Sequence, residues 1–465
     1  MQQLDQIAFS VVDVQRTERW FRDAFGFLPA GGTRAFRGWG ARHVQGLPGA
    51  ASTCWWLVDR SAHFQIELFQ FEAPLARLMP ADHRPCDVGY SRVGFWVQDF
   101  DRTLERLAAL GTPPLTAPIG KAGERRVCVR SPDGVFIEVM EDDPLRGRTN
   151  DARRDCRVAA RSVTLSVADL EKSKRFFMTA LGMSQSAAAL RRPEHEALWG
   201  LDGATTRSVV LDAGNVLVEL VQYLDPVGRP WPAGHRISDQ GILNIAFGYR
   251  RMRDMMDSYR RSRSAGARPN GFPLHVVNWG VVYVNDEQEF SVELLWVKPR
   301  WDARMGFTPM PPGKRPLPDT HRVEHTVSIA APPDRVWNLV TDHRAMPDWF
   351  PLDTVALSRE GWPAPNGVGA ERAMRGPKMN VREQVIGWEP RRSLDYRLLE
   401  GAPICCHQGR VELKPVAGGT ELKWSIRYRA KIPGTSGIVR RAMEKMLGVA
   451  LPRLKKLAET GCAGT

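Results

Sequence analysis

Long apolar runs and CxxC motifs are both missing from this sequence of 465 residues. No apolar stretch approaches the roughly 20 residues that cross a bilayer, so no transmembrane segment is expected. The seven cysteines are scattered and form no CxxC pair, which favours reduced thiols over a disulfide framework. Residues 1–5 contain no basic segment leading into an apolar one, so no signal peptide is expected. We therefore expect a cytoplasmic protein of ordinary globular composition.

Acidic residues are also fewer than basic ones, with 52 Asp and Glu against 65 Lys and Arg. Residues 321–465 hold +8 of the net +13, from 23 basic and 15 acidic residues. No zinc-finger spacing, RNP-type aromatic motif or recognition-helix pattern accompanies this excess. Solvated arginines explain the charge, so specific nucleic-acid binding is not expected.

A module of β-α-β-β-β type occurs four times in the first two thirds of the chain. Its opening strands align at 6–9, 92–95, 162–165 and 244–247. An amphipathic helix follows and ends at a glycine, as at Gly26, which suits a left-handed helix stop. A buried carboxylate in a strand must be paired, protonated or bound to a cation. Candidate pockets are therefore marked by the one glutamate in each last strand: Glu67, Glu138, Glu219 and Glu293.

The motif Ser131-Pro-Asp-Gly134, followed by Ile137-Glu-Val139, resembles the ending of the vicinal oxygen chelate superfamily. That superfamily contains glyoxalases, bleomycin-resistance proteins and extradiol dioxygenases. The resemblance implies paired modules that curl into cupped sheets, with a pocket in each cup. We expect consecutive modules to pair, which gives one domain at 1–145 and a second at 156–298.

In that superfamily a divalent metal is held by the first-strand residue of each module and by the terminal glutamate. Carried over, the first domain offers the pocket residues Gln6, Glu67, Arg92 and Glu138. A guanidinium has no lone pair to donate. We therefore expect Arg92 to form a salt bridge with Glu67 or Glu138 where a metal would lie.

The second domain offers Ser162, Glu219, Asn244 and Glu293 at the same positions. No histidine stands at any of them, so neither catalytic iron nor zinc is expected, and the prediction is that no cofactor is needed. If a metal is bound, the hard oxygens of Glu219, Asn244 and Glu293 suit a divalent cation such as Mg²⁺ or Ca²⁺ in this domain. The alternative is that both pockets are degenerate, with the glutamates hydrogen-bonded in apolar cups.

The last third of the chain has a different pattern. Six prolines within 299–320 predict an extended linker. A strand, two short helices, six strands and a long helix at about 436–458 are predicted next. With Ala331-Pro-Pro-Asp334 before Val336-Trp337, and Trp388-Glu-Pro390, this order resembles the helix-grip superfamily of START domains and aromatic polyketide cyclases. That resemblance implies a curved sheet around the last helix, enclosing an apolar cavity.

Three polar residues share strand phase with apolar neighbours in this segment: His407, Tyr396 and Glu383. A neutral histidine and a tyrosine could shuttle a proton during an enolisation or aldol cyclisation. Each could equally be a satisfied polar group of the core. A stripe through Ile438, Ala442, Met446, Ala450 and Leu454 predicts the face of the last helix that forms the cavity wall.

The predicted fold class is α+β, with two tandem domains of paired modules and a helix-grip domain at 321–460. The leading hypothesis is an isomerase, epimerase or cyclase–dehydratase acting on an apolar polycyclic or aromatic substrate, polyketide-like or steroid-like. Its predicted catalytic residues are Glu219 and Glu293 as acid and base, Asn244 as donor to an enolate, and His407 with Tyr396. The alternative is a carrier or resistance protein that binds apolar ligands without chemistry, and an extradiol-type dioxygenase would require iron. A homodimer is compatible with the sequence.

Overall fold

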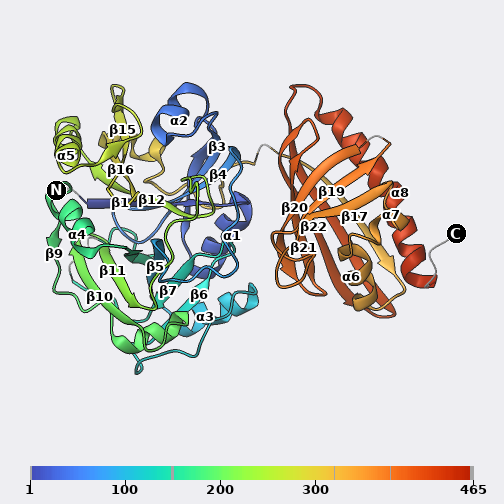
Figure 1. The fold of residues 1–465 in the computed structure, drawn as a ribbon, viewed down its shortest axis with the longest axis horizontal. Helices are drawn as coiled ribbons and strands as arrows, with labels where there is room; N and C mark the ends of the chain where they lie inside the picture. Colours follow the sequence, from blue (N-terminus) through green and yellow to red (C-terminus); the bar gives the residue numbers. More distant parts are fainter. Residues whose placement is uncertain (1–2, 148–150, 319, 378, 461–465) are drawn as a thin grey trace. The chain divides into compact units, whose positions relative to one another are not determined.

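The computed structural model describes residues 3–147, 151–318, 320–377 and 379–460 and divides into two units (Figure 1). Unit 1 spans Met1–Pro316 and unit 2 spans Leu317–Thr465, and each is described by itself. The predicted α+β class is confirmed. None of the helices in the described ranges has the length and apolar character needed to cross a bilayer. Cys462 and the first two residues lie outside the described residues.

Unit 1 contains the four predicted modules. The first comprises β1 (Gln3–Ser10), α1 (Val14–Phe25), β2 (Leu28–Thr33), α2 (Gly38–Gln45), β3 (Ala51–Val58) and β4 (Gln65–Ala73). The second comprises β5 (Gly89–Val97), α3 (Phe100–Ala109), β6 (Arg126–Arg130) and β7 (Phe136–Met140). The third comprises β8 (Val158–Ser166), α4 (Leu170–Thr179), β9 (Ser184–Gln185), the 3₁₀ helix η1 (Pro193–Trp199), β10 (Thr205–Asp212) and β11 (Leu217–Asp225). The fourth comprises β12 (Gly241–Tyr249), α5 (Met252–Ser264), β13 (Arg268–Pro269), β14 (Leu274–His275), β15 (Trp279–Asn285) and β16 (Ser291–Val297).

Three of the four module helices begin at an aspartate whose side chain caps the helix. Asp13, Asp99 and Asp169 each accept a hydrogen bond from a backbone N–H of the first turn. The fourth helix begins after Arg251, which makes no such bond. An N-cap acceptor satisfies amides that have no partner inside the helix. The predicted glycine stop holds for α1, where Gly26 has a φ of 84°, but α3, α4 and α5 end at Leu110, Ala180 and Ala265 before their glycines.

The pairing of consecutive modules was predicted wrongly. One sheet has the order β13-β15-β16-β12-β1-β4-β3-β2, so the first module pairs with the fourth. The other has the order β6-β7-β5-β8-β11-β10-β9, so the second pairs with the third. The repeat could not settle this, because all four opening strands carry the same alternation and each can pair with any other. The predicted domains 1–145 and 156–298 are thus joined in one unit by both sheets.

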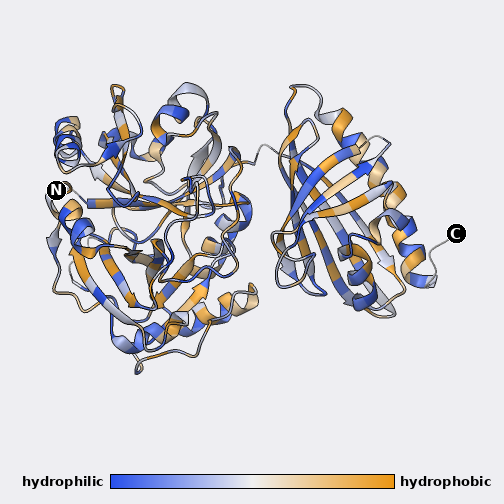
Figure 2. Cartoon of the chain, viewed as in Figure 1, coloured by the Kyte–Doolittle hydropathy of each residue, from blue (hydrophilic) through white to orange (hydrophobic). Residues whose placement is uncertain are grey.

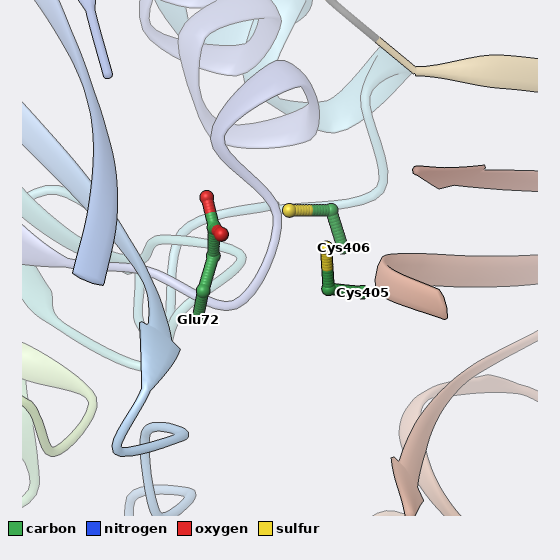
Figure 3. A group of neighbouring side chains, drawn as sticks. All are labelled: Glu72, Cys405 and Cys406. Atoms are coloured by element: carbon green, nitrogen blue, oxygen red, sulfur yellow. The ribbon is translucent and has the colours of Figure 1, made fainter. Parts of the chain in front are cut away.

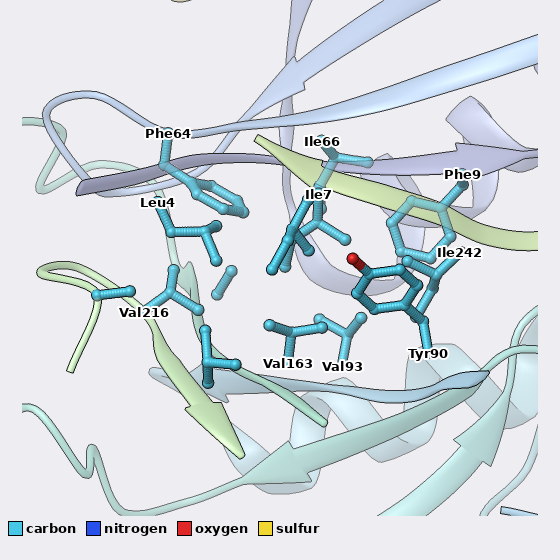
Figure 4. Close-up of a cluster of buried hydrophobic side chains, with 14 of the residues drawn as sticks. Leu4, Ile7, Phe9, Phe64, Ile66, Tyr90, Val93, Val163, Val216 and Ile242 are labelled. Atoms are coloured by element: carbon cyan, nitrogen blue, oxygen red, sulfur yellow. The ribbon is translucent and has the colours of Figure 1, made fainter. Parts of the chain in front are cut away.

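Strand alternation gives each sheet one face in the central core and one face in a cup. Ile7, Phe9 and Ile66 of one sheet lie in the same apolar core as Val93 and Val163 of the other (Figure 4). Figure 2 shows apolar and polar residues mixed along the strands of unit 1. Because successive side chains point to opposite faces, Gln6 and Glu67 lie on the cup side.

The predicted linker at 299–320 is only partly a linker. Pro299–Met305 forms the 3₁₀ helix η2, and Phe307 after it is buried. The Phe307 carbonyl accepts a hydrogen bond of 2.8 Å from Arg153, and the ring stacks on His63 with centroids 4.0 Å apart. Phe307 therefore attaches the start of this segment to unit 1, and the Met310 N–H extends the attachment by donating to the Pro29 carbonyl at 2.7 Å.

Unit 2 has the predicted order of elements. It contains β17 (His321–Ile329), α6 (Pro333–Thr341), α7 (Met346–Trp349), β18 (Thr354–Arg359), β19 (Glu371–Gly376), β20 (Met379–Glu389), β21 (Ser393–Glu400), β22 (Ile404–Val416), β23 (Gly419–Ala430) and α8 (Ser436–Thr460). The sheet is antiparallel in the order β17-β23-β22-β21-β20-β19-β18. Its apolar core includes side chains of α6, α7 and α8.

The predicted stripe on α8 is right for its second half only. Ala450 and Leu454 are buried, with Leu447, Leu451 and Ala458 beside them. Ile438 is 69% exposed and Ala442 is exposed as well. Residues spaced by four advance about 40° around a helix at each step, so a stripe of four such steps winds off the packed face.

Candidate functional sites

The first candidate site, which we call cup A, consists of Gln6, Glu67, Asn244 and Glu293. Strand register brings them together in two rows across one sheet. In one row Glu67, Ala8 and Asn244 are neighbours on β4, β1 and β12. In the other row Gln6, Ala246 and Glu293 are neighbours on β1, β12 and β16. The residue between the polar ends of each row is a fully buried alanine, Ala8 in one row and Ala246 in the other.

Glu67 in cup A accepts three hydrogen bonds. Gln6 Nε2 donates to Oε2, while Trp56 Nε1 donates to Oε1 at 2.9 Å and Cys54 Sγ to Oε1 at 3.1 Å. Burial nevertheless raises the pKa of Glu67 to about 7, although these bonds favour its ionised form. Glu67 is therefore held in place and close to a balance between its two protonation states.

Glu293 and Asn244 are the incompletely satisfied members of cup A. Burial, followed by the negative charge of Glu67, raises the pKa of Glu293 well above its ordinary value. Glu293 Oε2 and both polar side-chain atoms of Asn244 are buried and make no well-formed hydrogen bond among the described residues, although Tyr283 and Asn244 lie close enough to Glu293 to favour its ionised form. Buried polar atoms normally have partners, so cup A has unused capacity for a cation or a polar ligand.

The equivalent site in the second sheet, which we call cup B, is filled by its own charges. Arg92 Nη2 donates to Glu219 Oε2 at 3.0 Å, and Thr164 Oγ1 donates to the same oxygen at 2.8 Å. Glu219, Thr164 and Arg92 form one row across β11, β8 and β5, which explains the contact. Arg92 also lies 3.9 Å from the ring centroid of Trp199. The prediction that Arg92 pairs with Glu67 or Glu138 is wrong, because its salt bridge is with Glu219.

Two further ion pairs close cup B. Arg126 Nη1 lies 3.0 Å from Glu138 Oε1, and Arg191 pairs with Glu196. Ser162 packs against Gly94, where a Cβ would come within 2.2 Å of its Oγ. The predicted set of Glu219, Asn244 and Glu293 is therefore not brought together, because Glu219 belongs to the other sheet. Cup A, which holds the oxygen atoms suited to a cation, is therefore formed by the first and fourth modules.

The interior of unit 2 contains a buried ion pair. Arg372 Nη1 lies 3.6 Å from Glu383 Oε1, and both side chains are almost fully buried. Arg372 Nη2 also donates to the Thr341 carbonyl at 2.9 Å, at the last residue of α6. A cation at the C-terminus of a helix complements the helix dipole. Burial raises the pKa of Glu383 to about 7, although the charge of Arg372 opposes this.

Tyr396 and His407 lie in the same interior. Trp424 Nε1 donates to the Tyr396 hydroxyl at 2.8 Å, and burial raises the pKa of that hydroxyl. Gly409 is required beside it, because a Cβ there would lie 2.0 Å from the Tyr396 ring. The centroid of the His407 ring is 5.5 Å from that of Tyr396. The sequence thus placed His407 and Tyr396 together, and their catalytic role stays a prediction.

His407 stands next to an irregularity that the sequence did not reveal. The register of β22 shifts between Cys405 and Gln408, and Cys406 has a φ of 52°. His407 Nδ1 accepts a hydrogen bond of 3.2 Å from the Leu398 backbone N–H, and burial lowers the pKa of His407 to about 4. The ring is therefore neutral and carries its proton on Nε2. Figure 3 draws Cys405 and Cys406 with Glu72 of unit 1, and we assign no metal site to a group divided between the units.

Comparison with known families gives one match in each unit. Residues 5–129 match the family described as "Glyoxalase/Bleomycin resistance protein/Dioxygenase superfamily". Residues 320–459 match "Polyketide cyclase / dehydrase and lipid transport". The chain joins a glyoxalase-superfamily region to a polyketide cyclase/START-like domain.

A curated relative and two solved structures illustrate the likeness. The granaticin polyketide synthase bifunctional cyclase/dehydratase of Streptomyces violaceoruber is 30% identical over an alignment of 165 residues that covers 32% of this chain. The chain covers 48% of that relative's length. Glyoxalase I of Zea mays is 16% identical over 63% of this chain and 92% of its own, with a TM-score of 0.44. A START superfamily protein of Mycobacterium smegmatis is 17% identical over 30% of this chain and 99% of its own, with a TM-score of 0.28.

The glyoxalase superfamily implies a divalent metal, and the residues of cup A fit one. Gln6, Glu67, Asn244 and Glu293 offer carboxylate and amide oxygens, which hard cations prefer. The buried polar atoms of Asn244 and Glu293 that make no well-formed hydrogen bond are the observation that supports the fit. The residues of cup B do not fit, because Arg92 already neutralises Glu219 there.

Several side chains that complete these sites were missed in the sequence. Trp56 and Tyr283 stand opposite Glu67 and Glu293 in neighbouring strands, a relation that depends on register. Arg372 could have been predicted as a buried residue from the sequence, because it alternates with Ala370 and Met374 on a face that is otherwise apolar. A basic residue in such a phase marks a buried charge that needs a partner.

Proposed function

We propose that unit 2 is an enzyme domain that catalyses aldol-type cyclisation and dehydration of an apolar, polyketone-like substrate. The observation that carries the proposal is Glu383, a buried carboxylate with a pKa of about 7 that faces Arg372. A general base works best when its pKa lies near the working pH. The family match and the name of the granaticin relative support the same reaction class.

Each polar group of the interior has a distinct role in this proposal. Glu383 removes a proton from a carbon between two carbonyl groups, and the enolate attacks a third carbonyl of the same molecule. Arg372 lies beside Glu383 and stabilises the oxygen on which negative charge develops. Tyr396, whose hydroxyl accepts from Trp424, protonates that oxygen to give a hydroxyl group and recovers its proton from Glu383. In the dehydration Glu383 removes the second proton of the same carbon, Tyr396 protonates the hydroxyl group as it leaves as water, and Glu383 returns the proton to Tyr396. His407 donates through Nε2 to a carbonyl oxygen and orients the substrate.

Replacing Glu383 by glutamine tests this function. With a synthetic linear 3,5,7-triketo ester as substrate, we expect turnover to fall by about 10²-fold, because the amide cannot accept the proton. The wild-type rate should rise as pH increases through about 7, and the variant should lose this dependence. Absorbance of the cyclised aromatic product is the measurement.

Glu412→Gln is the matched control, because that glutamate lies on β22 with a side chain 43% exposed. The control should keep full activity. If the wild-type protein cyclises the triketo ester no faster than the spontaneous reaction, the cyclase proposal fails and the carrier alternative stands.

The predicted homodimer and cytoplasmic location remain predictions.

Cup A supports a second candidate function, metal-assisted proton transfer in unit 1. We propose that Gln6, Glu67, Asn244 and Glu293 hold a divalent cation there, a set that differs from the predicted one in the second domain. When bound, the cation would polarise a carbonyl or enolate oxygen of a ligand. The chain's own residues orient that site, since Trp56 and Cys54 fix Glu67 by hydrogen bonds.

Addition of Mn²⁺ or Mg²⁺ is expected to raise the thermal midpoint of unit 1. A cation at a hundredfold excess over its Kd stabilises the folded form by about 2.7 kcal/mol, which corresponds to a shift of several degrees. Glu293→Gln should abolish the shift, while the surface variant Glu171→Gln, 59% exposed, should keep it. Calorimetry with and without the cation measures this. A shift that persists in Glu293→Gln would place the cation elsewhere.

A further inference from the structure

A pocket lies at the start of α2 in unit 1, and none of the four cup A residues lines it. Its volume is about 410 Å³, and it is lined by Arg37, Gly38, Trp39, Arg42, Gly49, Ala50 and Ala51. Ala50 also belongs to the apolar cluster on the cup side of the sheet, as does Ala41 of α2. The helix α2 therefore contributes residues both to the cup-side apolar cluster and to this pocket. A volume of this size is in the range of small-molecule sites.

Large aromatic side chains gather at the rim of the pocket instead of being buried. Trp39 is 64% exposed and Phe272 is 60% exposed. The Trp39 ring stacks on His43 with centroids 5.0 Å apart and an interplanar angle of 19°. His43 in turn lies 4.1 Å from the Phe272 ring, and its Nε2 lies 2.8 Å from the Phe272 carbonyl oxygen. Exposed aromatic clusters of this kind mark binding surfaces.

The rim is held in position by contacts between the first and fourth modules. Asn270 Nδ2 donates to the Val44 carbonyl at 3.1 Å, and its Oδ1 accepts from Asn285 Nδ2 at 2.8 Å. The Trp39 ring is therefore presented on a supported helix, with its outer face open to solvent. An open indole face binds planar aromatic groups by stacking.

The two arginines of the pocket differ in what they already bind. Arg37 is fully engaged by Glu72, to which both of its terminal nitrogens donate. No carboxylate among the described residues pairs with Arg42, although it lines the same pocket. A guanidinium beside an open aromatic face recognises a carboxylate or phenolate on a planar ring.

We propose that this pocket is a binding site for planar aromatic anions, with Trp39 stacking on the ring system and Arg42 pairing with the charge. The ligand class is a fused-ring carboxylate or phenolate. The site goes beyond the function proposed for unit 2 and beyond the cation of cup A, and it depends on neither.

The test uses the full chain labelled with 5-fluorotryptophan and observed by ¹⁹F NMR. Trp39→Phe and Trp362→Phe assign two resonances, and Trp362, 65% exposed in unit 2, is the internal control. The probe is 2-naphthoate, and its neutral counterpart is 2-naphthalenemethanol. We expect 2-naphthoate to shift the Trp39 resonance saturably and to leave Trp362 unmoved.

The charge is tested separately from the stacking. The neutral probe should bind about tenfold more weakly, since it lacks a charge-assisted hydrogen bond. Arg42→Gln should reduce the affinity for 2-naphthoate to that of the neutral probe, and the exposed Arg263→Gln of α5 should not. The proposal is overturned if Trp39 does not respond, if Trp362 responds equally, or if both probes bind alike.

Discussion

Replacing Arg372 by methionine is expected to destabilise unit 2 by about 3–5 kcal/mol, because it leaves a buried carboxylate without its cation. The pair is almost fully buried, with side-chain exposures of 2% and 7%. Methionine fills much of the same volume but offers neither the contact with Glu383 nor the hydrogen bond to the Thr341 carbonyl. Urea denaturation followed by tryptophan fluorescence measures the loss.

A neighbouring surface pair supplies the control for this prediction. Arg382 on β20 pairs with Glu371 on β19 at 3.1 Å, with side-chain exposures of 40% and 15%. Arg382→Met should cost no more than about 1 kcal/mol, since solvent screens such pairs. The double variant Arg372→Met/Glu383→Leu should recover most of the stability, because no unpaired charge is left inside. Equal losses for Arg372→Met and Arg382→Met would mean that burial of the pair contributes nothing.

The fold of unit 2 followed from local patterns. Each predicted strand and helix is present, because short antiparallel connections leave few ways to arrange them. The α8 stripe failed only where a spacing of four residues drifts around the helix, which places Ile438 in solvent. A β-bulge also leaves no trace in the alternation of apolar and polar residues. The register shift of β22 beside Cys406, next to His407, was therefore not predicted.

The pairing of modules in unit 1 did not follow from local patterns. Four strands with the same alternation have several compatible partners, and only the tertiary fold chooses among them. The pairing of modules decides which polar residues meet in each cup. With β12 beside β1, Asn244 joins Glu67, and with β8 beside β5, Arg92 meets Glu219. The family resemblance therefore identified the polar residues of the cups, but the prediction assigned them to the wrong pairs of modules.

Replacing Arg92 by methionine is expected to destabilise unit 1 by about 3–5 kcal/mol at neutral pH, since Glu219 would lose the closest of its cations. Glu219 is also approached by Arg191 at 3.7 Å, but that arginine is shared with Glu196. The surface arginine Arg125, which pairs with Asp101 and Glu141, is the control, and Arg125→Met should cost about 1 kcal/mol or less.

The pH dependence distinguishes a charge effect at Arg92 from lost packing. Burial alone would raise the pKa of Glu219, but the charges of Arg191 and Arg92 and the hydrogen bond from Thr164 hold it below its ordinary value. A carboxyl whose folded-state pKa is lowered stabilises the protein above its unfolded-state pKa, and this stability is lost as the pH falls. Without Arg92 the pKa of Glu219 rises, so the difference between wild type and variant should shrink below about pH 4.5, where the carboxyl is protonated in the variant. Denaturation series at pH 8 and pH 4 measure this. A difference that stays constant across the range would assign the loss to the stacking of Arg92 on Trp199, which carries no such dependence.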